Sequence, residues 1–188
     1  MDDSKILGLY RMRKNTLLID IEVKFYREIF NTWDFSPELN RDLDDDLFEY
    51  LEECCREIPL KSPICIVIHL PSGIFDPQKE ELNKKSFENY FGYRIRRLQI
   101  KKKKMYKDAA LYASYGLLFI LLATLMEHFM PINTLFSVLK EGFFIGGWVL
   151  FWELFSTLFF TKGEVKETMR ILRRLQQAPI EYEYENKI

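Results

Sequence analysis

Two long apolar runs constrain this chain more than any other feature of its sequence. Residues 109–126 read AALYASYGLLFILLATLM without a charged side chain, and residues 142–161 form a second run in which Glu153 is the only charge. A helix that rises 1.5 Å per residue needs about 20 residues to cross the roughly 30 Å hydrocarbon core of a bilayer. We therefore predict a transmembrane hairpin with spans at about 109–127 and 142–161.

The alternative is that both runs are core helices of a soluble domain. Helices that are hydrophobic on all sides must be enclosed by other apolar surface. A chain of 188 residues offers too little of that surface for two such helices. The sequence therefore favours the lipid bilayer as the surroundings of both runs.

The distribution of cations predicts the orientation of the hairpin. Basic residues precede the first run and follow the second, whereas the connection 127–141 contains only Lys140. Cytoplasmic flanks of membrane helices carry an excess of lysine and arginine. We expect a multi-pass protein of the inner (cytoplasmic) membrane with both termini in the cytoplasm. In the connection, Pro131 is expected to break the helix, and residues 135–139 to lie in the outer interface.

Three segments outside the apolar runs have the patterns of β-strands. Residues 17–24, LLIDIEVK, and residues 179–187, PIEYEYENK, alternate apolar and polar side chains, as strands with one hydrated face do. Residues 64–70, ICIVIHL, are almost continuously apolar, which is typical of a strand covered on both faces. The sequence predicts a small cytoplasmic sheet of about three strands with residues 64–70 at its centre.

Helical patterns occupy most of the remaining chain. We expect a short turn at 25–30, a helix that begins at an Asp42 cap, a long helix over 80–107, and a final helix over 164–177 that Gly163 separates from the second span. The predicted fold class is α+β with an inserted two-helix hairpin. Its parts are a cytoplasmic domain (1–107), the hairpin (108–161) and a helix and strand that complete the domain (162–188).

Two segments carry a resemblance to known sequences. RDLDDDLFEYLEECCREIPLKSPICIVIHLP and EGFFIGGWVLFWELF resemble an uncharacterised family of small prokaryotic proteins with two transmembrane helices and an N-terminal cytoplasmic α+β domain. The similarity extends from about Leu17 to Tyr184. It implies a topology and no activity, so it assigns no functional residue.

Glu153 is the most informative polar residue of the apolar runs. It lies about eight residues from the inner end of its helix, hence roughly 12 Å deep. An ionised carboxylate at that depth is costly and is expected to face protein or water. It shares one helix face with small and polar residues, and the first span has a matching stripe of small residues around Gly116. The members of the Glu153 face are Gly142, Gly146, Val149, Glu153 and either Ser156 or Thr157.

Three interpretations of Glu153 remain open in the sequence. In the first, the two stripes pack together and the Tyr115 hydroxyl donates a hydrogen bond to the carboxylate. In the second, several copies surround an axis and present Gly146, Glu153 and Thr157 to a lumen, where an acidic ring favours cations. In the third, the face binds a partner membrane helix.

A dense block of cations precedes the first span. Such a block fixes membrane orientation, and its side chains extend toward lipid headgroups. A stronger interpretation is recognition of anionic lipids, to which each cation contributes about 1 kcal/mol. The residues assigned to lipid headgroups are Arg97, Lys101, Lys102, Lys103 and Lys104.

Motifs for catalysis, metals and nucleic acids are missing from the sequence. It has no phosphate-binding glycine loop and no nucleophile elbow. Cys54, Cys55 and Cys65 have neither metal spacing nor a disulfide framework, which fits a reducing compartment. We expect no enzyme activity, no catalytic residue, no metal and no cofactor, and the net charge of −1 gives no reason to expect nucleic acid as a partner.

Together these features favour a membrane protein that associates with itself. Its cytoplasmic domain is expected to bind an unknown ligand or protein and to act on the hairpin, which forms a cation-permeable pore. Two alternatives remain open: a non-conducting membrane adaptor or scaffold, and a ligand-activated effector that disrupts the membrane.

Overall fold

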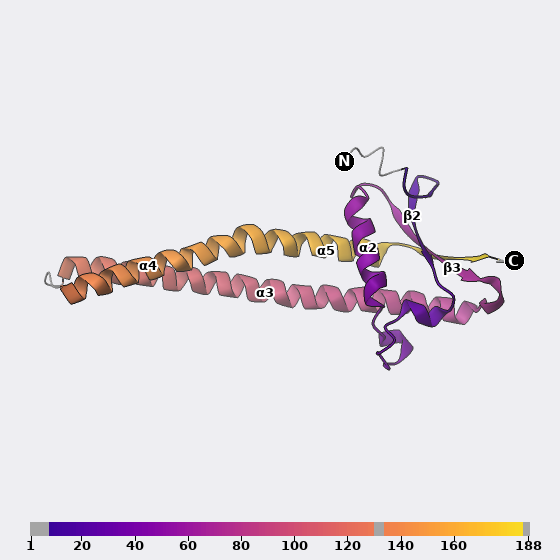
Figure 1. Ribbon diagram of the computed structural model, residues 1–188, viewed down its shortest axis with the longest axis horizontal. Helices are drawn as coiled ribbons and strands as arrows, with labels where there is room; N and C mark the ends of the chain where they lie inside the picture. The colour runs from indigo at the N-terminus through magenta and orange to yellow at the C-terminus, as the bar shows by residue number, and fades with distance from the viewer. Residues whose placement is uncertain (1–7, 130–133, 186–188) are drawn as a thin grey trace. The chain divides into compact units, whose positions relative to one another are not determined.

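The computed structural model describes residues 8–129 and 134–185, and the chain divides into two compact units. The first unit combines Met1–Arg96 with Met169–Ile188, and the second is Arg97–Thr168. The first unit contains the sheet, and the second contains the helical hairpin (Figure 1). The sheet-containing unit is therefore built from two segments that are far apart in the sequence.

A four-stranded sheet organises the first unit. Its strands are β1 (Met12–Arg13), β2 (Thr16–Glu22), β3 (Ile64–Pro71) and β4 (Ile180–Glu185), in the spatial order β1-β2-β3-β4. β1 is antiparallel to β2, whereas β2, β3 and β4 are parallel (Figure 1). The three predicted strands are confirmed, and β3 lies between β2 and β4 as its apolar sequence predicted. The prediction of about three strands omitted β1.

β1 pairs with β2 through a tight turn for which the sequence lacks the usual signal. Lys14 and Asn15 join β1 to β2 with φ angles of 46° and 68°. Two consecutive residues with positive φ form the type of tight turn that suits a β-hairpin, but the usual signal is Asn-Gly or Asp-Gly. Without that signal, and with a strand of only two residues, β1 has no distinct sequence pattern.

Helix α2 (Asp45–Glu57) packs its apolar side chains into the core of the first unit. Phe48, Leu51, Cys54 and Cys55 are buried. The side chain of Asp44 accepts hydrogen bonds from the amides of Asp46 and Leu47, which makes it the N-cap. The predicted Asp42 cap is therefore wrong by two residues. The turn predicted at 25–30 is a 3₁₀ helix, η1 (Tyr26–Ile29), and shorter 3₁₀ turns follow at η2 (Glu38–Asn40) and η3 (Ser72–Ile74).

Helix α3 (Pro77–Phe129) is one continuous helix of 53 residues. It joins the predicted helix 80–107 and the first apolar run without a break. Its N-terminal part belongs to the first unit, where Phe87 and Phe91 are each only 1% exposed. Because the same helix contributes to the core and contains the apolar run, the chain leaves the first unit through a regular helix.

The second long helical segment differs from the prediction at both of its ends. It consists of α4 (Thr134–Ser156), a π-helical turn η4 (Thr157–Thr161) and α5 (Lys162–Gln177). Residues 135–139 belong to the first turns of α4, and their place at a membrane interface stays a prediction. Gly163 lies inside α5, so it does not separate two helices; the irregular turn is η4. Pro131 lies outside the described residues.

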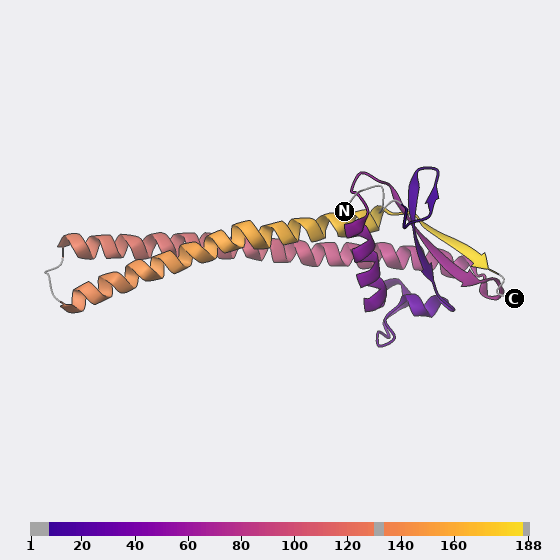
Figure 2. The same cartoon turned by 45° about the horizontal axis from the view of Figure 1, so that its top comes forward.

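Small residues allow α3 and α4 to approach closely within the hairpin (Figure 2). A Cβ atom added to Gly147 would lie 2.7 Å from Ile120 Cγ1 and 3.2 Å from the carbonyl oxygen of Gly116. Ala109, Gly116 and Ala123 are buried, which confirms the predicted packing stripe on α3. On α4, however, the buried glycine is Gly147, next to the predicted Gly146. The contact face of α4 is thus rotated relative to the prediction.

Candidate functional site

The rotation of α4 determines where Glu153 lies. The inward positions of α4 are Gly147 and its helical neighbours Phe143, Leu150 and Leu154, all buried or half-buried. Glu153 is exposed and lies outside this inward row, and it forms no hydrogen bond or ion pair with another described residue. The first interpretation, a clamp between the two helices, therefore fails in the single chain.

The other residues predicted to act with Glu153 separate into two groups. Gly142 and Val149 are exposed, as Glu153 is, whereas Gly146 and Thr157 are half-buried. Tyr115 is 52% exposed, and no described hydrogen bond joins it to Glu153. The outer face of α4 thus carries Gly142, Val149 and Glu153 in one row at helical spacing. We call these three residues the outer row.

The basic block lies on the surface of α3. Lys101, Lys102, Lys103 and Lys104 are exposed and form no ion pair with a described residue, and Arg97 is also exposed. Side chains of this kind are available to anionic headgroups. Their predicted role at the lipid surface remains a prediction.

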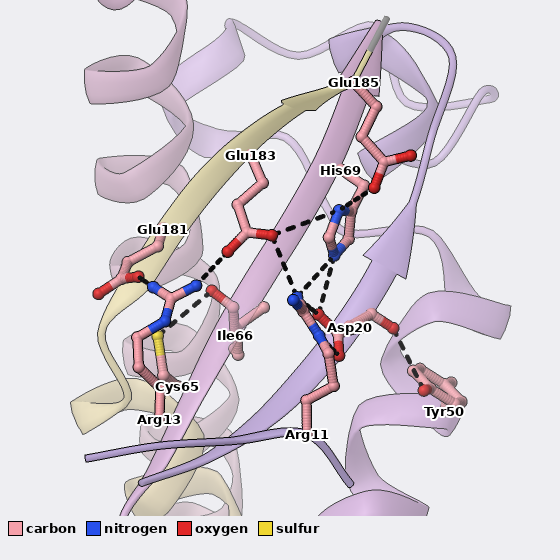
Figure 3. A network of polar contacts seen from close by, with 10 residues as sticks. All are labelled: Arg11, Arg13, Asp20, Tyr50, Cys65, Ile66, His69, Glu181, Glu183 and Glu185. Carbon is pink, nitrogen blue, oxygen red and sulfur yellow. Dashed lines mark hydrogen bonds and ion pairs between the residues drawn. The ribbon is translucent and has the colours of Figure 1, made fainter. Parts of the chain in front are cut away.

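One face of the sheet carries a cluster of charged side chains that the sequence patterns did not predict. It joins Arg11 and Arg13, at the N-terminal end of the sheet, to acidic side chains on β2 and β4 (Figure 3). Arg11 Nε lies 2.9 Å from Asp20 Oδ2, and Arg11 Nη2 lies 3.2 Å from Glu183 Oε2. Arg13 bonds Glu183 and lies 2.7 Å from Glu181 Oε2. We call this set the charged face.

His69 lies at the centre of the charged face. Its Nε2 atom is 2.8 Å from Asp20 Oδ1, and its Nδ1 atom is 3.4 Å from Glu185 Oε1 (Figure 3). The parallel register places Glu22 and Glu183 beside His69 on the neighbouring strands. Alternation along β2 and β4 was visible in the sequence, but Arg11 and Arg13 precede an unpredicted turn. That is why the cluster was not predicted.

The electrostatics of the charged face favour ionised carboxylates. The Arg11 guanidinium, helped by a hydrogen bond from His69, lowers the pKa of Asp20 to about 2. Burial opposes ionisation of Glu183, but hydrogen bonds from Arg13 and Arg11 leave its pKa below the usual value. The cluster is a network of ion pairs that fastens the N-terminal hairpin across β2, β3 and β4, and within it the buried His69 Nδ1 atom has no hydrogen-bond partner among the described residues. Its chemistry is structural.

The sulfur and metal chemistry of the described residues is limited. Within the described ranges, no group of three or more histidine, cysteine or acidic side chains is arranged to hold a metal ion. Cys54, Cys55 and Cys65 are buried and form no disulfide. Burial raises the pKa of the Cys65 thiol to about 11, so this thiol stays protonated at neutral pH.

Comparisons with protein-family models, with characterised proteins and with solved structures gave no match for this chain.

Proposed function

We propose that this chain is an integral membrane protein that assembles from several copies and couples a cytoplasmic binding domain to a cation-permeable hairpin. The observation that carries this proposal is the exposed position of Glu153 as the single charged side chain of residues 142–161. A carboxylate in that position needs a polar neighbour, and none of the residues in 8–129 and 134–185 provides one.

The burial of the two apolar helices supports their insertion into a bilayer. Both are long and apolar enough to cross a membrane, and only 17% and 6% of their most apolar 18-residue windows is buried. The core helix of a soluble protein would be mostly covered by other side chains. Trp148 and Trp152, for example, are 59% and 72% exposed. Lipid tails in the inner membrane would cover these surfaces.

The outer row supports self-association. A lone charged side chain in the bilayer costs a few kcal/mol or more, so carboxylates in membrane helices face protein or water. A Cβ atom at Gly142 would meet no atom within 4 Å, which leaves room for a neighbouring helix at this position. Copies that meet along this face bring their Glu153 side chains together around an axis. A ring of carboxylates favours the passage of cations.

The connectivity supports coupling between the two units. The chain enters the second unit through α3, which follows the central strand β3 after the short η3 turn, and returns through α5, which leads into β4. A ligand that moves β3 relative to β4 would therefore act on the helices at both ends of the hairpin. We place the sheet-containing unit in the cytoplasm, with the basic block at the inner headgroups.

Reconstitution into liposomes tests this function. We expect the Gly142→Cys variant to form cross-linked oligomers in liposomes, and we expect the wild-type protein to conduct cations, measured with a cation-sensitive dye. Glu153→Gln should preserve the cross-linking and lower the preference for cations over anions by about tenfold, because the acidic ring loses its charge. Glu141→Gln, an exposed carboxylate outside the predicted span, is the matched control and should change neither property.

Two outcomes would contradict parts of the proposal. Monomers in liposomes would remove both self-association and conduction. Oligomers without ion flux would remove conduction and leave a membrane adaptor, in which the hairpin anchors the domain and the domain recruits a partner.

A further inference from the structure

A hollow in the first unit lies beyond the carboxyl ends of two parallel strands. β2 ends at Glu22 and β3 at Pro71. The segments directly after these two strands, together with the first turn of α3, line an open hollow of about 530 Å³. Ligands of open sheets with parallel strands bind beyond the carboxyl ends of the strands, and small-molecule sites occupy about 300–1,000 Å³.

Two cations line this hollow without a carboxylate partner. The Arg27 guanidinium lies 5.4 Å from the centroid of the Phe25 ring, and Lys79 Nζ lies 6.0 Å from that of Tyr26. Among the described residues, neither cation forms an ion pair. The one carboxylate in the lining, Asp76, accepts hydrogen bonds from the amides of Gln78 and Lys79. Both cations are therefore available to an anionic ligand.

Aromatic side chains provide the apolar surface of the hollow. Phe75 is 60% exposed and Phe25 is 48% exposed. Phe75 contacts the Tyr184 ring edge-on, with centroids 5.1 Å apart and an interplanar angle of 90°. Exposed aromatic faces of this kind stack against planar rings such as nucleobases.

We propose that this hollow binds a phosphate that carries an aromatic ring, of the nucleoside monophosphate class. The phosphate pairs with Arg27 and Lys79, and the base stacks on Phe75 or Phe25. This nucleotide would be the ligand of the cytoplasmic domain. Binding itself does not depend on the proposed function, whereas the effect of binding on the hairpin rests on it.

A hydrogen-bonded chain connects the hollow to the helices of the first unit. The Tyr26 hydroxyl accepts a hydrogen bond from the Asp76 amide at 3.2 Å and lies 2.6 Å from the Tyr184 hydroxyl. Tyr184 in turn donates to Glu80 on α3. The segment after β2, the strand β4 and the start of α3 thus meet beneath the ligand. Occupancy of the hollow acts directly on the first turn of the helix that leads into the apolar hairpin.

Binding to the full chain in detergent micelles tests the proposal. The probes are adenosine monophosphate, adenosine and inorganic phosphate, measured by isothermal titration calorimetry. We expect saturable binding of adenosine monophosphate, and at least about tenfold weaker binding of adenosine or phosphate alone, because each offers only one of the two contacts. Guanosine monophosphate extends the test to a second base.

Substitutions locate the site. Arg27→Gln and Lys79→Gln should each weaken binding of adenosine monophosphate by about tenfold or more, and Phe75→Ala by a similar factor. Lys85→Gln, an exposed lysine on α3 that pairs with Glu81, is the matched control and should leave the affinity unchanged. A Cβ atom at Gly73 would meet no atom within 4 Å, so Gly73→Leu should fold normally and obstruct the hollow.

Two results would overturn the assignment. One is the absence of saturable binding of either nucleotide at 1 mM, which is about the weak limit for a specific small-molecule site. The other is an affinity that stays unchanged in the Arg27→Gln, Lys79→Gln double variant. Because the titration uses micelles, it does not require conduction. Failure of the pore and failure of this site are thus separate results.

Discussion

At the scale of single residues, Asp20 links three parts of the charged face. It accepts hydrogen bonds from Arg11 and contacts His69 on the adjacent strand. Its carboxylate is two-thirds shielded from solvent, with 32% of the side chain exposed. Arg11 and His69 interact favourably with the ionised carboxylate of Asp20, so these contacts stabilise the fold only while Asp20 is charged.

The lowered pKa of Asp20 gives a pH dependence with a definite sign. Because the pKa is about 2 in the folded chain and 3.8 ordinarily, the stabilisation is complete above about pH 4 and is lost as the pH falls toward 2. Asp20→Asn should lower the melting temperature at pH 7 and flatten its dependence between pH 4 and pH 2. Circular dichroism of the detergent-solubilised protein measures both, with Glu88→Gln as an exposed control. A slope as steep as that of the wild type would contradict the role of Asp20.

Arg174 has a structural role that no pattern in the sequence indicates. It is one of the basic residues that follow the second apolar run, yet its guanidinium is partly buried against the end of α2. Its Nη1 and Nη2 atoms donate to four carbonyl oxygens at distances of 2.8–3.2 Å. The acceptors are Cys55, Ile58, Pro59 and Ser62. Burial lowers the pKa of Arg174, but carbonyl groups at a helix C-terminus favour its charge.

Arg174→Met should therefore destabilise the first unit by about 2–4 kcal/mol, because the carbonyl groups lose their donors. Arg173→Met alters an exposed neighbour and should change the free energy of unfolding by less than about 0.5 kcal/mol. Chemical unfolding followed by far-ultraviolet circular dichroism compares the two. Equal effects of the two substitutions would show that Arg174 acts only as a surface charge.

At the scale of elements, the contact between α3 and α4 depends on the absence of side chains at two glycines. Gly147→Ala should destabilise the hairpin by about 1–3 kcal/mol, because its Cβ atom would lie 2.7 Å from Ile120 Cγ1. Gly163→Ala is the matched control: it lies in a helix, and its Cβ atom would meet nothing within 4 Å. It should stabilise the helix by about 0.5–1 kcal/mol. Fluorescence of Trp148 and Trp152 during unfolding in detergent reports on the hairpin.

The elements show which features sequence patterns can predict. β3 was predictable because ICIVIHL is apolar along its whole length, and α2 because its apolar residues repeat at helical spacing. β1 was not, since it has two residues and a turn without glycine. The contact face of α4 was missed because Gly146 and Gly147 are adjacent, and small-residue spacing fits either one. The hollow beside Phe75 combines segments about 50 residues apart, so no local pattern contains it.

At the scale of the whole molecule, the sheet-containing unit depends on both ends of the chain. β4 pairs with β3 over six residue positions, and Leu172 and Leu175 of α5 are buried. A fragment of residues 1–96 lacks these partners and would expose one edge of β3. We expect that fragment alone to remain unfolded, and the same fragment joined by a flexible linker to residues 169–188 to fold.

Amide nuclear magnetic resonance spectra of the two fragments check this expectation through the dispersion of their signals. The control is the linked fragment in which Ile180 and Tyr182 are changed to serine. It should not fold, because both side chains lie on the half-buried face of β4. Dispersed signals from residues 1–96 alone would contradict the dependence on β4.

The position of β4 also sets the order of events on the ribosome. Residues 97–179, which contain both apolar helices, must be translated before β4 can pair with β3. At bacterial and eukaryotic elongation rates, these roughly eighty residues take about 4–17 s. During that delay the nascent N-terminal segment presents an unpaired edge of β3, a target for chaperones or for misassembly. The sheet can therefore be completed only after both apolar helices have been translated.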